Sequence, residues 1–299
     1  MQHTFKLVAV AAALCAASAA QAAVGFDANL ELDTTYLNDA NGRKSDLNMA
    51  GRVELNAAAK ATNGDAFVAG RASLLIKKDG DAAVDDLWVQ FGNAGADVKL
   101  GRFEAVDLFP LAKDTVVDEV AGTYKANALR GRFGSNTFHG ALGLNAGAGM
   151  RVELGLVQSK TDGNVKGVRP AVVYTTGPLT LRAGFESVKT VGSTAGSETG
   201  VGLSLGYALS ADTNVNVNYA KKEDDKTFGA NITMGAAGLG LISGKGATEA
   251  SKSTTVYMAY SLPLMGVKGA TITPALSFSK GGSGTDGQTA ARVRINYAF

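Results

Sequence analysis

Hydrophobic and polar residues alternate one by one along most of the chain. In the run 26–36, apolar side chains share one face, while Asp27, Asn29 and Glu31 share the other. The same alternation recurs in the runs 47–57, 201–207, 215–219 and 228–234. A period of two is typical of β-strands, and no 3.6-residue pattern of comparable length competes with it. The sequence therefore predicts an all-β chain.

The connections between the predicted strands alternate between short and long. Short turns such as 93–95 and 176–178 alternate with longer polar segments such as 37–45, 159–167 and 188–199. Transmembrane barrels have short turns at one end, longer loops at the other, and strands that are apolar toward lipid and polar toward the lumen. A soluble sandwich also alternates, but unequal loops favour a closed transmembrane antiparallel β-barrel.

Chain length sets the expected number of strands. A spanning strand of about 10 residues with a connection of about 7 predicts about sixteen strands for residues 23–299. The segment 125–158 fits one strand or three, so fourteen and eighteen strands stay open. Pro170 and Pro274 fall inside predicted strands, where each removes a hydrogen-bond donor, and we expect them near strand ends or at bulges.

The N-terminal segment has the form of a secretory signal peptide. Lys6 precedes an apolar stretch, 7–17, and Ala20-Gln21-Ala22 has the A-x-A form of a cleavage site. The apolar stretch is shorter than the roughly 20 residues that a membrane-spanning helix needs. We therefore expect a cleaved signal peptide, 1–22, followed by a single barrel domain, 23–299.

Composition narrows the function classes. The chain has 29 Lys and Arg against 27 Asp and Glu, a balance that argues against a nucleic-acid partner. Its 1 Cys excludes a structural zinc site built on two or more cysteines. Among 299 residues, 38 are Gly and 5 are Pro, and scarce Pro suits a closed hydrogen-bonded ladder.

The last predicted strand places Val293, Ile295, Tyr297 and Phe299 on one face and ends on an aromatic residue. Such a strand is similar to the assembly signal of Gram-negative outer-membrane barrels, with Tyr297 and Phe299 as the signal residues. The similarity implies location in the cell outer membrane of a Gram-negative bacterium, with outer-membrane lipid and the barrel-assembly machinery as partners.

Three segments carry a resemblance to Gram-negative porins. Residues 98–104 close the fifth predicted strand and precede 105–123, which lacks strand periodicity and looks like the third porin loop, folded into the lumen. Residues 126–136 resemble the porin strand that leaves that loop. Residues 174–181 resemble a porin strand, its tight turn and the next strand. The run 101–110 looks most like carbohydrate porins.

The resemblance implies a water-filled channel for passive diffusion of small hydrophilic solutes, with sugars favoured, and a homotrimer. A general or weakly anion-preferring diffusion porin is the alternative, and a soluble periplasmic β-rich binding protein is the competitor from another class. No enzymatic activity, cofactor or metal is expected. His139, the histidine available for proton transfer after cleavage, has no acidic residue within ten positions.

Candidate pore residues are inward-facing arginines and the carboxylates in and next to the loop that follows the fifth predicted strand. The basic set is Arg52, Arg71, Arg102, Arg130, Arg132 and Arg151, and the acidic set is Glu104, Asp107, Asp114, Asp118 and Glu119. The porin resemblance implies that Arg52, Arg71 and Arg102 face Glu104, Asp107 and Asp114. Opposed charges in a narrow passage create a transverse field that orients dipolar solutes.

Aromatic side chains line the lumen of sugar-selective channels. By that resemblance, candidates for stacking against a solute are Trp88, Phe103, Phe109 and Tyr124. A separate acidic group, Asp79, Asp81, Asp85 and Asp86, is expected at an external loop. A solvated acidic loop is favoured there over a weak calcium site.

Overall fold

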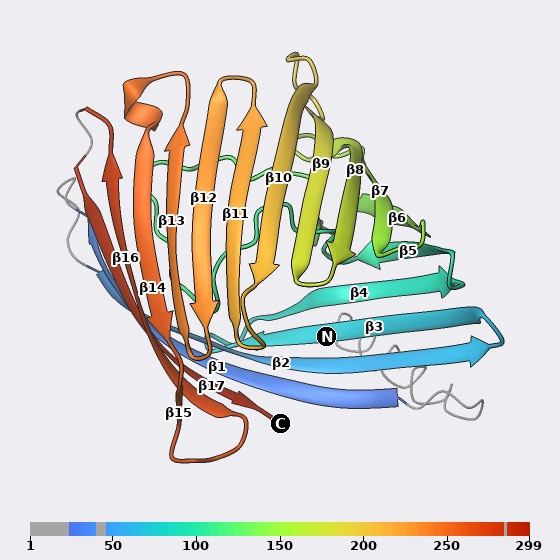
Figure 1. Cartoon of the computed structure of the whole chain (residues 1–299), viewed down its shortest axis with the longest axis horizontal. Coiled ribbons are helices and arrows are strands. Elements are labelled where there is room, and N and C mark those ends of the chain that lie inside the picture. The colour runs from blue at the N-terminus through green and yellow to red at the C-terminus, as the bar shows by residue number, and fades with distance from the viewer. Residues whose placement is uncertain (1–23, 40–45, 284–285) are drawn as a thin grey trace.

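The computed structural model describes residues 24–39, 46–283 and 286–299, so the expected signal peptide and its cleavage site lie outside the described residues. The described chain forms one closed antiparallel β-barrel (Figure 1). Its strands are β1 (Val24–Asp39), β2 (Asp46–Asn63), β3 (Ala66–Lys77), β4 (Ala82–Gly92), β5 (Ala96–Arg102), β6 (Thr137–Asn145), β7 (Met150–Ser159), β8 (Val165–Thr176), β9 (Leu179–Thr190), β10 (Glu198–Ala208), β11 (Thr213–Lys222), β12 (Asp225–Met234), β13 (Ala237–Lys245), β14 (Ser253–Tyr260), β15 (Leu262–Pro263), β16 (Ala270–Gly281) and β17 (Gln288–Ala298).

The barrel has sixteen spanning strands, because β15 continues the line of β14 and both pair with β16. Consecutive strands pair along the whole chain, and β1 closes the barrel by pairing with β17 as well as β2. The predicted all-β barrel of about sixteen strands is confirmed, and the alternatives of fourteen and eighteen strands are wrong. No helix among the described residues has the length and apolar character needed to cross a membrane.

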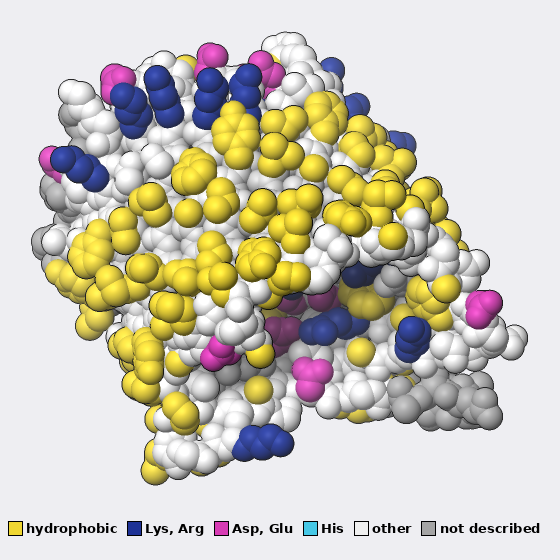
Figure 2. Space-filling model, viewed as in Figure 1, with side chains coloured by type: hydrophobic (Ala, Val, Ile, Leu, Met, Phe, Trp, Pro, Cys, Tyr) yellow, Lys and Arg dark blue, Asp and Glu magenta, His cyan; other side chains and the backbone are white. Residues whose placement is uncertain are grey.

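Side chains alternate between the outer surface and the lumen. On β10, Val201, Leu203 and Leu205 are exposed outward, whereas the intervening Gly202 and Ser204 are buried on the inner side. Figure 2 shows the result as a broad apolar band over the barrel wall, with a row of basic side chains along its upper edge. Apolar side chains on this outer face are what a lipid environment requires of a barrel.

The connections follow the predicted parity with three exceptions. At one end the turns are short except for 264–269, which joins β15 to β16, and the β8–β9 turn consists of Gly177 and Pro178. Gly177 has φ +52°, a left-handed conformation that glycine adopts without steric cost. At the other end most connections are longer, but 78–81 and 223–224 are also tight. A 3-10 turn, η2 (Glu249–Ser251), precedes β14.

The segment 125–158 differs from the expectation of one strand or three. It contains β6 and all but the last residue of β7, and the residues 126–136 that resemble a porin strand are irregular. The β-type pairing found in the segment 126–136 is an isolated bridge between Gly131 and Glu104. The alternation in 126–136 therefore reflects packing of a loop against the wall, which period-two patterning alone does not distinguish from a strand.

Pro170 and Pro274 lie inside their strands and not near the ends. The β8–β9 pairing is interrupted between Val168 and Ala171, where Pro170 has no N–H to donate. Opposite Pro274, the partner strand breaks between β14 and β15. Each proline is thus accommodated by a local gap in one ladder while the register on either side is kept.

Candidate functional site

The segment 103–136, between β5 and β6, contacts inward-facing residues of the opposite wall. In Figure 1 this green segment runs behind β10–β13. Asn218 on β11 and Asn231 on β12 each donate a side-chain hydrogen bond of 2.8 Å to the Pro110 carbonyl. The main-chain N–H groups of Asp118 and Val120 donate to Ser277 and Ser279 on β16. The segment is therefore tied to strands more than a hundred residues away.

Glycines on the inner wall make room for this segment. A methyl group at Gly202 would lie 2.7 Å from the Ala126 Cβ and 2.8 Å from the Leu108 Cβ. A methyl group at Gly229 would lie 2.7 Å from the Phe109 ring. Leu108 and Phe109 are fully buried in a cluster with wall residues. The high glycine content thus has a local cause, because a side chain at these positions would displace the segment.

One group of charges joins the two ends of the segment to β4. Arg130 Nη2 lies 2.9 Å from Glu104 Oε2 and 3.7 Å from Asp107 Oδ2. Arg132 lies 3.3 Å from carboxylate oxygens of both Asp85 and Asp86. Burial lowers the pKa of Arg132, but the opposing effect of the Glu104, Asp85 and Asp86 carboxylates is larger in sum. The pKa of Arg132 is therefore raised overall. This group, which we name the arginine–carboxylate cluster, is Arg130, Arg132, Asp85, Asp86, Glu104 and Asp107.

A β-bulge explains how adjacent aspartates reach the same arginine. The β3–β4 register shifts between Ala72 and Leu74, so that Asp85 and Asp86 together lie opposite Ser73. Two residues opposing one lets consecutive side chains turn toward the same side of the sheet. Asp85 and Asp86 were expected near an external loop, and both lie in β4, close to the turn 78–81. Asp79 and Asp81 lie in the β3–β4 turn.

Asp114 makes a second contact with the wall, on β17. Its Oδ1 lies 2.9 Å from Arg292 Nη2 and 3.1 Å from Arg294 Nη1. Arg294 also forms a bidentate pair with Asp33 on β1 at 2.7 Å. Asp114 and Arg132 both have positive φ, at 36° and 59°. Such backbone strain costs on the order of 1 kcal/mol or more and persists where surrounding contacts hold it.

The expectation that Arg52, Arg71 and Arg102 face Glu104, Asp107 and Asp114 stays a prediction, and the direct contacts of these arginines among the described residues are with other groups. Arg52 pairs with Glu31 at 2.8 Å, and Arg71 lies 3.5 Å from Asp86. Arg102 donates to the main-chain carbonyls of Val84, Asp85, Arg132 and Phe133. Arg102 therefore connects residues 132–133, at the end of the segment 103–136, to β4. The arginines that face the acids of 103–136 are Arg130, Arg132, Arg292 and Arg294.

The remaining charged candidates lie apart from the arginine–carboxylate cluster. Arg151 forms a bidentate pair with Asp97 near the short-turn end. Asp118 accepts a hydrogen bond of 2.7 Å from Gln288. Glu119 binds within its own segment, with Thr123 and Lys125 both at 2.5 Å. Arg151 and Glu119 thus hold local structure, and Asp118 connects the segment to β17.

The aromatic candidates divide into buried and partly exposed rings. Phe103 and Phe109 are each 1% exposed, so their expected role in stacking against a solute is wrong. Phe103 stacks on His139 with ring centroids 4.0 Å apart. Trp88 is partly exposed, and Lys99 Nζ lies 4.1 Å from the centroid of its ring. Of the predicted set, Trp88 and Tyr124 keep partly exposed rings.

A buried ion pair that no motif in the sequence marks anchors the return of the segment 103–136. Glu186 on β9 accepts hydrogen bonds from Tyr124 Oη at 2.5 Å and from the main-chain N–H groups of Ala128 and Leu129. Arg169 on β8 lies 3.7 Å from Glu186, and their side chains are 1% and 0% exposed. Burial, followed by this hydrogen bond to Glu186, raises the pKa of Tyr124 and keeps it a phenol. We name Arg169, Glu186 and Tyr124 the loop anchor.

The described residues hold no group of three or more His, Cys, Asp or Glu side chains arranged for a metal ion. Tyr297 and Phe299, the predicted assembly signal, are exposed and stack with ring centroids 5.1 Å apart. Phe299 also exchanges two main-chain hydrogen bonds with Ala28, which brings the last residue into the closing pair of strands.

Comparisons with known proteins agree on the fold. A family model described as porin-like glycoporin RafY matches residues 10–139. A mutant of Rh. blastica porin is 14% identical, with a TM-score of 0.65, and the match covers 93% of this chain and 100% of that chain. A loop-deletion mutant of OmpT, an outer membrane protein of Vibrio cholerae, is 15% identical, with a TM-score of 0.68. That match covers 93% of this chain and 99% of that chain. No curated protein sequence matches significantly. The chain therefore has the porin fold.

Proposed function

We propose that the protein is an outer-membrane porin, a water-filled channel for passive diffusion of small hydrophilic solutes, and that sugars are its preferred class. Its location is the outer membrane of a Gram-negative bacterium. The observation that carries the proposal is the arginine–carboxylate cluster, which lies inside a closed barrel whose outer face is apolar. The glycoporin family match supports the sugar preference. The segment 103–136 constricts the channel and places charges of both signs across it.

Two further parts of the proposal concern partners. The barrel assembles as a homotrimer, and the exposed rings of Tyr297 and Phe299 present the C-terminal strand to the barrel-assembly machinery. Porin-fold neighbours support the trimer by analogy alone. Crosslinking of the detergent-solubilised protein tests the trimer. A crosslinked trimer is expected, and a monomer band alone would contradict it.

Planar-bilayer recording tests the channel itself. Adding the refolded protein is expected to produce discrete current steps, and maltose- or raffinose-sized saccharides are expected to block the current in a saturable manner. Current without saturable block favours the general or weakly anion-preferring porin. Recovery of the native protein wholly in the aqueous periplasmic fraction would overturn the porin proposal and favour the soluble binding protein.

Trp88 tests the sugar preference at one side chain. Since Lys99 occupies one face of the indole, a sugar ring would stack on the other face. Trp88→Ala is expected to weaken saccharide block about threefold, the scale of one aromatic contact. Trp88→Phe keeps a ring and is expected to retain most of the block, while Tyr207→Ala on the outer face is a control. Equal block in the wild type and Trp88→Ala would remove Trp88 from the solute path.

A further inference from the structure

Arg182 lies on the inner wall of the barrel, next to the segment 103–136 and on its short-turn side. On β9, Glu186 and Gly184 have the same inward parity as Arg182. Glu186 anchors the segment, and a methyl group at Gly184 would overlap the Leu108 side chain. Arg182 is the next inward residue toward the β8–β9 turn. It therefore lines the lumen between the segment and the short-turn end.

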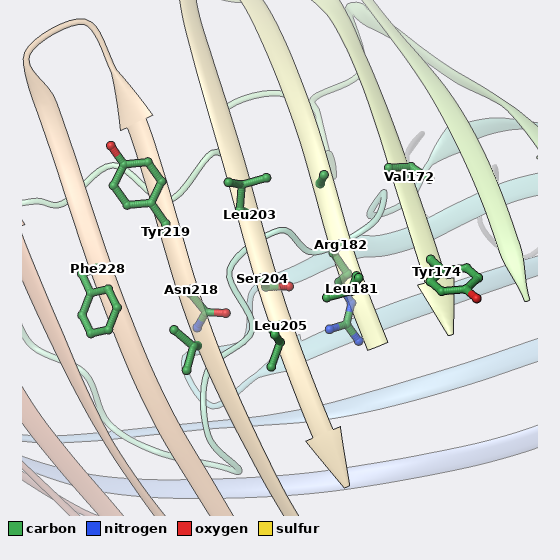
Figure 3. Close-up of a pocket in the computed structure, with 12 residues that line it drawn as sticks. Val172, Tyr174, Leu181, Arg182, Leu203, Ser204, Leu205, Asn218, Tyr219 and Phe228 are labelled. Carbon is green, nitrogen blue, oxygen red and sulfur yellow. The ribbon is translucent and has the colours of Figure 1, made fainter. Parts of the chain in front are cut away.

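Arg182 has no counter-charge among the described residues. Every other arginine that the structure describes forms an ion pair or, in the case of Arg102, donates to main-chain carbonyls. Arg182 is half-buried, and its Nη1 is buried without a partner, which leaves the Nε–Nη2 edge toward the lumen. Ser204 Oγ and Asn218 Oδ1, on the two adjacent strands, are also buried without a partner (Figure 3). A cation held partly out of water without a partner is unfavourable, so Arg182 is suited to receive an anion.

The inward positions that surround Arg182 are uncharged. Val173 on β8 and Ser204 on β10 lie directly opposite Arg182. Thr180 and Gly184 flank it on its own strand. The diagonal inward positions on β8 and β10 are Ala171, Thr175, Gly202 and Gly206. None of these neighbours carries a carboxylate that could compete with a solute for the guanidinium group.

Asn216 on β11 supplies a hydrogen-bond acceptor beside Arg182. A methyl group at Gly206 would lie 2.8 Å from Asn216 Oδ1 and 3.8 Å from Arg182 Nη1, so the two side chains converge over this glycine. The amide nitrogen of Asn216 donates to Asn231 Oδ1 at 3.1 Å, and within the described chain no donor reaches Asn216 Oδ1. A guanidinium donor and an amide acceptor thus face the same small space, which the absence of a side chain at Gly206 keeps open.

This pair of groups indicates the chemistry of the solute. A carboxylate matches the planar fork of a guanidinium edge and accepts two charge-assisted hydrogen bonds from it. A hydroxyl on the carbon next to that carboxylate can donate to Asn216 Oδ1. A neutral sugar has hydroxyls without the charge, so it uses only half of the site. A hydroxylated carboxylate uses both halves, and sugar acids are the polyhydroxylated members of that class.

We propose that Arg182, Gly206 and Asn216 form a binding subsite for sugar acids, between the constriction and the periplasmic exit. The short turns of a transmembrane barrel face the periplasm, which places the subsite on that side of the segment 103–136. Conduction requires binding that is favourable enough for entry and weak enough for release, and a single guanidinium fork open to water fits that range. The inference rests on the proposed channel and names acidic sugars as the class that binds best within it.

The test measures binding of glucuronate and of glucose to the detergent-solubilised barrel by saturation-transfer NMR, which needs no current. The wild type should bind glucuronate at least about tenfold more tightly than glucose. Arg182→Gln should weaken glucuronate binding about tenfold, the scale of a hydrogen-bonded charge, and leave glucose binding unchanged. Asn216→Ala should weaken glucuronate binding about fivefold, the scale of one neutral hydrogen bond.

Two further variants separate the fork from net charge. Arg182→Lys keeps the charge without the fork and should lose about threefold in glucuronate affinity. Arg151→Gln changes the net charge by the same amount as Arg182→Gln near the same end of the barrel, and it should leave glucuronate binding unchanged because Arg151 already pairs with Asp97. Equal losses in Arg151→Gln and Arg182→Gln would overturn the subsite, as would equal glucuronate affinity in the wild type and Arg182→Gln.

Planar-bilayer recording separates this inference from the proposed channel. Arg182→Gln should conduct salt in discrete steps and be blocked by maltose-sized saccharides like the wild type, while block by glucuronate is lost. Absence of current steps in the wild type would contradict the channel. Current steps with the same glucuronate block in the wild type and Arg182→Gln would contradict the subsite alone.

Discussion

Replacing Arg130 and Arg132 by glutamine is expected to shift the channel toward cation preference, with a roughly threefold rise in the cation-to-anion permeability ratio. The two guanidinium groups pair with Glu104, Asp107, Asp85 and Asp86 and offset part of their negative charge. Without them four carboxylates remain together, and a low-dielectric passage focuses their field. The measurement is the reversal potential across a planar bilayer under a salt gradient.

A second double variant, which removes acidic instead of basic side chains, makes this test stricter. Glu104→Gln with Asp107→Asn leaves Arg130 without its carboxylate partners and should shift the reversal potential toward anions. Arg151→Gln is the control, because Arg151 pairs with Asp97 outside the cluster and its loss should change selectivity little. Shifts of the same sign in both double variants, or none in either, would show that the cluster does not govern ion passage.

Arg102 illustrates what the sequence could and could not predict about the site. Alternation placed it on the inner face, and the structure agrees, but strand parity says nothing of which atoms a long side chain reaches. Arg102 is held by four main-chain carbonyls. Substituting it would disturb the exit of the segment 103–136, so it is a poor probe of selectivity. Its neighbour Arg132, held mainly by carboxylates, is the better one.

The fold was largely predictable because a barrel repeats one rule along the whole chain. Period-two alternation and unequal connections suffice for topology, since each strand pairs with its neighbours in sequence. The rule fails in 126–136, where an irregular segment alternates because one side packs on the wall, as Leu129 does. The Asp85–Asp86 bulge was also not predicted, although two consecutive polar residues between Val84 and Leu87 break the alternation at that point.

The contacts between residues far apart in the sequence were the part of the site that could not be predicted. Asp114 meets Arg292 and Arg294, and Pro110 meets Asn218 and Asn231, across separations of more than a hundred residues. These contacts depend on the path that an irregular segment takes, and no local propensity encodes that path. The one available signal was polar alternation on β11, which marks Asn218 as inward but not as a donor to a loop carbonyl.

Glu186→Gln is expected to release the returning half of the segment 103–136. Glu186 accepts from Tyr124, Ala128 and Leu129 and faces the buried Arg169. An amide would turn donors toward main-chain N–H groups and leave the guanidinium without a counter-charge. Breaking a buried pair from one side costs about 3 kcal/mol or more. The strand ladders are untouched, so the barrel should still form and resist denaturation by detergent.

Limited proteolysis measures the release directly. Lys125 lies between two anchored positions, and tryptic cleavage there should accelerate about a hundredfold if opening becomes easier by about 3 kcal/mol. Single-channel recordings should show added current noise, because the segment moves within the lumen. Tyr124→Phe removes one hydrogen bond and leaves the ion pair, so its effect on both readouts should be much smaller.

The double variant Arg169→Met/Glu186→Leu decides whether charge or contact holds the segment. Replacing a buried pair by apolar side chains of similar size is often neutral, because neither charge is left unpaired. The double variant should therefore cleave more slowly than Glu186→Gln, although it has lost the three hydrogen bonds that Glu186 accepts. If the double variant opens as readily as the single one, those hydrogen bonds carry the anchor. If Glu186→Gln cleaves and conducts like the wild type, Phe109 and its glycine-lined seat hold the segment without help from Glu186.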